Sequence, residues 1–195
     1  MKTLKVIVLV LVMVAAGWTV ERGLRGGMFE ARAATVERGK LKAERTIEGK
    51  VTRVSDGDTI WVTDAMNLRR KIRMLDIDAP ESSQPYGKES TKALSSRIYT
   101  KQVRVTYREL DQYGRVLGTV WLDGEDVNLW MVKQGHAWAY HYTKTPTYLA
   151  AMQKAKSAKL GLWAKDDAMD PWAYRKLKKG QPIDNSKGGK PWNRK

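Results

Sequence analysis

Acidic residues gather in two short segments of the chain, SDGDT at 55–59 and RMLDIDAPE at 73–81. The carboxylates in these segments are Asp56, Asp58, Asp76, Asp78 and Glu81. Clustered carboxylates repel one another unless a cation compensates, and oxygen ligands suit a hard divalent cation such as calcium. Asp58 and Asp78 would meet at one rim if the two segments form neighbouring strands. Each spacing alone is a weak metal signal, because aspartate is also common in turns.

Two arginines accompany these carboxylates. Arg73 lies inside an apolar segment, where a cation is costly unless it is paired, and Arg115 ends the turn-like sequence DQYGR. Guanidinium groups suit phosphate oxygens well. A divalent cation, two arginines and Glu81 as a base are the groups required for attack of water on a phosphodiester. The alternatives are a plain turn role for Arg115 and an internal ion pair for Arg73, with Asp76 or Glu81.

The composition of the 195-residue chain favours a polyanionic partner. The formal net charge is +15, which attracts nucleic acid, acidic lipid or acidic polysaccharide. The chain has no cysteine, so disulfides and thiolate metal sites are excluded. The two histidines are not assigned as ligands, since calcium does not require imidazole.

The hydrophobic pattern predicts a small barrel. Strands are expected on both sides of the Ser-Asp-Gly-Asp turn within 49–64, and over 70–80, 102–110 and 116–124. Helices are expected over 87–99, 126–135 and 145–161, with 137–142 as a short strand or an extended segment. This order indicates an α+β, mainly β fold: a five-stranded OB-fold Greek-key barrel with about three helices. Too few strands are available for a sandwich.

The two ends of the chain differ from the centre. Lys2 and Lys5 precede an apolar run at 6–20, which is short of the ~20 residues that span a bilayer and is typical of a secretory signal. Residues 1–34 are therefore expected to be a signal peptide or an uncleaved signal anchor, followed by a linker at 35–46. The protein is expected to be exported: secreted, periplasmic or anchored outside the membrane. Residues 171–195 are expected to be a basic, disordered tail.

Several motifs occur in a recognisable order: SDGDTIWV, IRMLDIDAPE, DQYGR, MVKQGHAWAYHY and KLGLWA. Their order and spacing over residues 47–165 resemble those of the thermonuclease (staphylococcal nuclease-like) family, so that 47–170 would be a nuclease domain. The resemblance implies an OB-fold barrel with three helices and a single calcium ion. It also implies a monomeric endonuclease of the micrococcal-nuclease type, which cleaves DNA and RNA and leaves 3′-phosphate ends.

The resemblance also gives each candidate residue a role. It implies that calcium is held by Asp58, Asp78 and the backbone carbonyl of Ala79, where the family's type member has threonine. It implies catalysis by Arg73, Glu81 and Arg115, and substrate contacts by Tyr113 and Tyr140. The alternative function is a non-catalytic OB-fold module that binds nucleic acid, either free or anchored to the membrane through residues 6–20.

Overall fold

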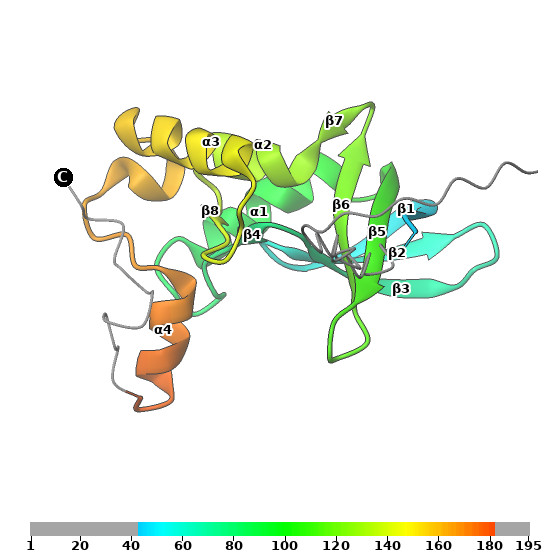
Figure 1. Ribbon diagram of the computed structural model, residues 1–195, viewed down its shortest axis with the longest axis horizontal. Coiled ribbons are helices and arrows are strands. Elements are labelled where there is room, and N and C mark those ends of the chain that lie inside the picture. Colours follow the sequence, from blue (N-terminus) through cyan, green and yellow to red (C-terminus); the bar gives the residue numbers. More distant parts are fainter. Residues whose placement is uncertain (1–42, 182–195) are drawn as a thin grey trace, which may run out of the picture. The chain divides into compact units, whose positions relative to one another are not determined.

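The computed structural model describes residues 43–181 of the chain (Figure 1). The strands are β1 (Arg45–Asp56), β2 (Thr59–Asp64), β3 (Arg69–Met74), β4 (Ile77–Asp78), β5 (Gln102–Leu110), β6 (Val116–Leu122), β7 (Glu125–Asp126) and β8 (Trp138–Ala139). The helices are α1 (Gly87–Ile98), α2 (Val127–Lys133), α3 (Pro146–Ser157), the 3₁₀ helix η1 (Gly161–Ala164) and α4 (Pro171–Lys178).

Five of the strands close into a barrel. The large sheet has the order β3-β2-β1-β5-β6-β7, and an additional parallel pairing joins β3 to β6. In that pairing Ile72 lies opposite Val116 and Met74 opposite Gly118. Closure removes the exposed sheet edges that a five-stranded sheet would otherwise present. The predicted mainly β OB-fold barrel is thereby confirmed.

The barrel core follows from strict alternation along the strands. In β6 the buried positions are Val116, Gly118, Val120 and Leu122, and the residues between them are partly exposed. This period of two places one face of the strand in the barrel interior. Helix α1 follows β4 and buries Leu94 and Ile98, which are four residues apart and therefore share one helix face. The helix packs against β1.

Asn128 ties the helices to the barrel through a fully buried side chain. Its Nδ2 donates to the carbonyls of Leu75 (2.9 Å) and Gly118 (3.1 Å), and its Oδ1 accepts from the amide of Val120 at 3.0 Å. One side chain therefore bonds three backbone groups, and a buried backbone group left without a partner would cost about 1–3 kcal/mol. The contact fixes the turn that follows β3, which carries the acidic segment.

Two sequence predictions are corrected by the structure. Residues 70–80 are not one strand: β3 ends at Met74, Asp76 has a left-handed φ of 63°, and β4 is a separate pair of residues. Residues 171–178 are not a disordered tail but helix α4, which exceeds the three helices expected. Asp170 caps this helix by accepting from the amides of Trp172 and Ala173, and Pro171 occupies its first turn.

The predicted signal or anchor, most of the linker and residues 182–195 of the tail lie outside the described residues. Between residues 43 and 181, no helix is long and apolar enough to cross a membrane.

Candidate active site

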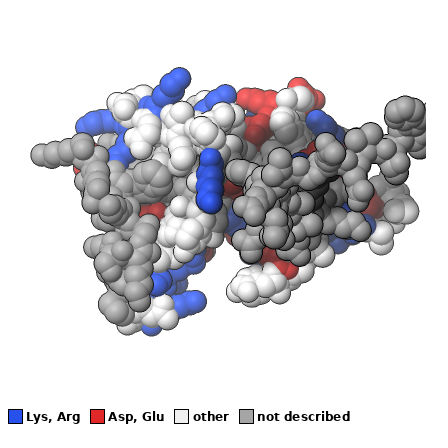
Figure 2. Space-filling model, viewed as in Figure 1, with Lys and Arg blue, Asp and Glu red and all other residues white. Residues whose placement is uncertain are grey.

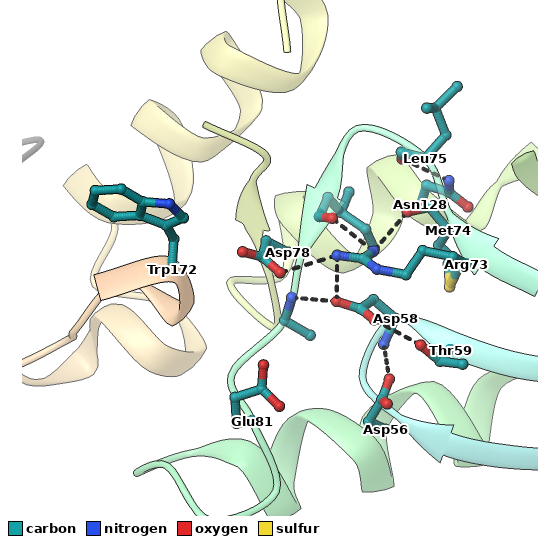
Figure 3. A network of polar contacts seen from close by, with 12 residues as sticks. Asp56, Asp58, Thr59, Arg73, Met74, Leu75, Asp78, Glu81, Asn128 and Trp172 are labelled. Carbon is teal, nitrogen blue, oxygen red and sulfur yellow. Dashed lines mark hydrogen bonds and ion pairs between the residues drawn. The ribbon is translucent and has the colours of Figure 1, made fainter. Parts of the chain in front are cut away.

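The guanidinium of Arg73 joins the two aspartates that the sequence predicted to converge. Its Nη2 lies 3.1 Å from Oδ2 of Asp58 and donates to Oδ1 of Asp78 at 3.0 Å. Its Nη1 donates to the carbonyls of Met74 (2.8 Å) and Ile77 (2.9 Å). All three side chains are largely buried. Figure 3 shows them in one continuous polar network, with Glu81 beside it.

Strand register explains why these residues meet. Thr59 lies opposite Arg73 in the antiparallel β2–β3 pair, and the amide of Met74 donates to the carbonyl of Asp58 at 2.8 Å. The start of β2 therefore lies beside the end of β3. The turn after β3 then returns the chain, so that the amide of Ala79 donates to Oδ2 of Asp58 at 2.8 Å. Arg73 pairs with Asp58 and Asp78, rather than with Asp76 or Glu81 as the alternative interpretation had it.

Two further acidic residues of the cluster, Asp56 and Asp76, have local roles. Asp56 accepts from the amide of Asp58 at 3.0 Å, which is the expected turn contact. Burial, together with the charge of Asp58, raises the pKa of Asp56 to about 7. Asp76 accepts from the Thr145 hydroxyl at 3.0 Å, just before helix α3. Its carboxylate thus fixes the entry to that helix.

A cavity of about 760 Å³ connects the network to the remaining predicted site residues. Besides the acidic cluster and Arg73, its lining includes Ala79, Tyr113, Arg115 and Tyr140. Arg115 is held at the end of the β5–β6 hairpin, where its Nε donates to Oδ2 of Asp111 at 2.6 Å. Its guanidinium carbon lies 5.5 Å from the ring centre of Tyr113. The structure therefore brings all eight candidate residues to one cavity. Among them, the side chain of Tyr113 is highly exposed.

Arg175 of α4 also lines this cavity, and the sequence analysis did not find it. Its Nη2 donates to Oδ2 of Asp78 at 2.8 Å, and its Nη1 to Oε1 of Glu81 at 2.8 Å. Burial raises the pKa of Asp78, although the hydrogen bond from Arg175 and the charge of Arg73 act in the opposite direction. The one sequence signal for this helix was Asp170-Pro171, a cap residue followed by a first-turn proline.

Comparison with known proteins identifies the family. The sequence model described as staphylococcal nuclease homologue matches residues 71–165. An uncharacterized endonuclease of Escherichia coli is 46% identical over 134 residues, which cover 68% of this chain and 87% of that protein. A micrococcal nuclease of Shigella flexneri is 36% identical over 159 residues, which cover 75% of this chain and 91% of that protein. The chain belongs to the staphylococcal nuclease family. Membership of this family supports a nuclease function.

A nuclease of this family is expected to hold calcium, and the donor chemistry of the site fits it. Asp58 and Asp78 both lie within 3.1 Å of one arginine nitrogen, so their oxygens converge. Two carboxylates and a carbonyl are hard ligands, and waters or substrate oxygens can complete the six to eight that calcium takes. Within residues 43–181, no three or more acidic, histidine or cysteine side chains form a ready metal cluster. Arginine nitrogens lie against the carboxylates instead.

Proposed function

We propose that the protein is a calcium-dependent endonuclease that hydrolyses phosphodiester bonds of DNA and RNA and leaves 3′-phosphate ends. The observation that carries this proposal is the convergence of Asp58, Arg73 and Asp78 at a cavity that Glu81 and Arg115 also line. A module that only bound nucleic acid would have no need to bury two carboxylates against one guanidinium, since that arrangement carries a desolvation cost.

The chain's own residues have distinct tasks in this proposal. Glu81 is half exposed at the cavity and accepts a proton from the attacking water. Arg115 uses Nε for its ion pair with Asp111, so we assign its Nη groups to the phosphate oxygens. Arg73 orients Asp58 and Asp78 and adds positive charge to the site.

Calcium bound by Asp58, Asp78 and the carbonyl of Ala79 would supply further positive charge for the phosphoryl oxygens. Tyr113 and Tyr140 are assigned to substrate contacts, because both line the cavity and an aromatic ring can stack on a base.

The decisive experiment is digestion of supercoiled plasmid and of RNA, with calcium and with a chelator. The matched variants are Glu81→Gln and Glu89→Gln, which remove the same charge from the cavity and from an exposed position on α1. We expect Glu81→Gln to lose a factor of about 10²–10⁴ in kcat, as for loss of a general base, and Glu89→Gln to remain active. End-group analysis should give 3′-phosphates. Wild-type protein that binds the plasmid without cutting it in calcium would instead support the non-catalytic module.

We also propose that the nuclease is exported, as a secreted or periplasmic protein or one anchored through residues 6–20. The support is Lys2 and Lys5 before the apolar run at 6–20. Cell fractionation followed by N-terminal sequencing tests this proposal, and recovery of the intact chain from the cytoplasm alone would refute it.

A further inference from the structure

Helix α4 places the guanidinium of Arg175 at the acidic side of the cavity. Nη1 of Arg175 donates to Oε1 of Glu81 at 2.8 Å and to Oδ1 of Asp78 at 3.2 Å, and Nη2 donates to Oδ2 of Asp78 at 2.8 Å. Both oxygens of Asp78 therefore have an arginine partner, and Oδ1 is shared between Arg73 and Arg175. Asp78 is buried, whereas the side chain of Arg175 is 38% exposed.

The helix is docked by contacts other than those of Arg175. The hydroxyl of Tyr174 donates to the carbonyl of Ser83 at 2.9 Å, and Lys178 donates to the Ser83 hydroxyl at 3.1 Å. Nε2 of Gln84 donates to the carbonyl of Met169 at 2.6 Å, just before the helix. Trp172 on the same helix packs near the ring of His141, at 5.0 Å between ring centres. Arg175 is thus held at the site by a docked helix (Figure 3 shows the position of Trp172 relative to Asp78).

The contacts of Arg175 fall on one predicted metal ligand and on the predicted base. Oδ1 of Asp78 accepts from both Arg73 and Arg175, and Oδ2 accepts from Arg175, so most lone-pair sites of this carboxylate are already used. The positive charge of the second guanidinium also repels a divalent cation that approaches Asp78. The same donors would reach a substrate phosphate only after leaving these carboxylates. Burial disfavours the charge of Arg175, but the hydrogen bonds and charges of Asp78 and Glu81 outweigh this and raise its pKa. The guanidinium therefore keeps its positive charge at neutral pH, as arginine ordinarily does.

We propose that Arg175 is an intramolecular competitor of the divalent cation for Asp78 and at the same time occupies the base Glu81, so that α4 restrains the nuclease until metal displaces the guanidinium. This inference rests on the proposed function, since it takes Asp78 as a metal ligand. The half-exposed position of Arg175 makes displacement feasible, because the side chain can move into solvent while Arg73 keeps its own contacts with Asp58 and Asp78. Apparent metal affinity is then reduced by the fraction of molecules in which Arg175 occupies the carboxylates.

The test is calorimetric titration of the full-length protein with calcium chloride, in the absence of nucleic acid. The variants are Arg175→Ala, Arg175→Lys and the control Arg45→Ala, which removes the same charge from an exposed position at the other end of β1 from the acidic turn. We expect Arg175→Ala to bind calcium about tenfold more tightly than wild type. Arg175→Lys should fall between them, since one ammonium cannot bridge both carboxylates as a guanidinium does. Arg45→Ala should match wild type.

Circular dichroism establishes that each variant is folded, and Arg175→Lys keeps the inference testable if Arg175→Ala is not. Calcium affinity that is unchanged or weaker in the folded Arg175 variants would overturn the competition. A raised KM with unchanged calcium affinity would do the same, and would identify Arg175 as a substrate ligand. The readout is separate from cleavage. If wild-type protein digests plasmid but the Arg175 variants bind calcium no more tightly than wild type, this inference alone is refuted. If the variants bind calcium more tightly but wild-type protein does not digest plasmid, the proposed function alone is refuted.

Discussion

The guanidinium of Arg73 is a structural group, and under the proposed function it is a catalytic group as well. It donates to two backbone carbonyls and lies against two buried carboxylates, Asp58 and Asp78. Removal of one partner of a buried charge network is costly, because the remaining charges stay buried and uncompensated. A substitution here therefore affects the stability of the protein as well as its catalytic rate.

We expect Arg73→Ala to lower the free energy of unfolding by about 3–5 kcal/mol, in addition to abolishing cleavage. Urea denaturation in the presence of a chelator measures this loss. Calcium should restore part of it, since a bound cation again separates Asp58 from Asp78. The control is Arg104→Ala, whose guanidinium lies over the ring of Trp121 on the surface and should cost about 1 kcal/mol or less. Wild-type stability in Arg73→Ala would show that the two carboxylates are well solvated without their arginine.

The local sequence pattern identified some residues of the site and missed others, and the difference has a physical reason. Asp58, Arg73 and Asp78 could be grouped from sequence because consecutive antiparallel strands place the start of one beside the end of the next. Arg175 contacts residues 94 and 97 positions earlier in the chain, and Asn128 reaches a carbonyl 53 positions away. Contacts of that separation depend on how helices pack on the closed barrel, which no local period encodes.

At the scale of elements, the start of α1 sets the position of Glu81. A Cβ added at Gly87 would lie 1.9 Å from the carbonyl oxygen of Glu81 and 2.7 Å from its carbonyl carbon. Helix propensity alone predicts that Gly87→Ala would stabilise α1 by about 1 kcal/mol. The overlap with backbone is the stronger effect, because atoms at 1.9 Å must move apart.

We therefore expect Gly87→Ala to lower the melting temperature and to reduce kcat about tenfold to a hundredfold, through displacement of the Glu81 backbone. Ser96→Ala is the matched control: Ser96 is exposed on the same helix, so this change should improve helix propensity and leave kcat unchanged. Thermal denaturation and steady-state kinetics on the three proteins provide the comparison. A Gly87→Ala enzyme with wild-type kcat would mean that the loop holds Glu81 independently of α1.

The sequence predicted a strand correctly where the alternation of apolar and polar residues was strong, as in β6. The prediction failed where a polar residue interrupted the alternation. Asp76 adopts a left-handed conformation after β3, which an apolar pattern of Met74, Leu75 and Ile77 does not reveal. Helix α4 was missed because its outward face is basic and only Pro171 is buried. Its docking depends on hydrogen bonds to Ser83 and on the contact between Trp172 and His141, rather than on an apolar stripe.

At the scale of the whole molecule, the dominant property is the net charge of +15. On the face drawn in Figure 2, Lys and Arg side chains are visible over α3 and α4, and acidic side chains lie near β7. A cationic surface binds nucleic acid by releasing counterions, so its contribution to affinity falls as salt rises. The cations of residues 182–195 extend this charge beyond α4: Lys187, Lys190, Arg194 and Lys195, against Asp184.

Deletion of residues 182–195 should weaken binding of duplex DNA at low salt and have little effect at high salt. A cut after Gln181 retains α4 and Arg175, so it isolates the terminal charges. If the four terminal cations each neutralise a phosphate, the slope of log affinity against log salt should become less steep by about 3–4. Fluorescence anisotropy with the Glu81→Gln background measures the slope without cleavage.

A full-length chain with these four cations changed to glutamine separates charge from length. Because counterion release depends on charge alone, this chain should reproduce the slope of the deletion. Equal slopes in the intact, deleted and glutamine chains would show that the terminal cations do not touch the DNA. The salt dependence of binding would then be assigned to the cations of the folded nuclease domain.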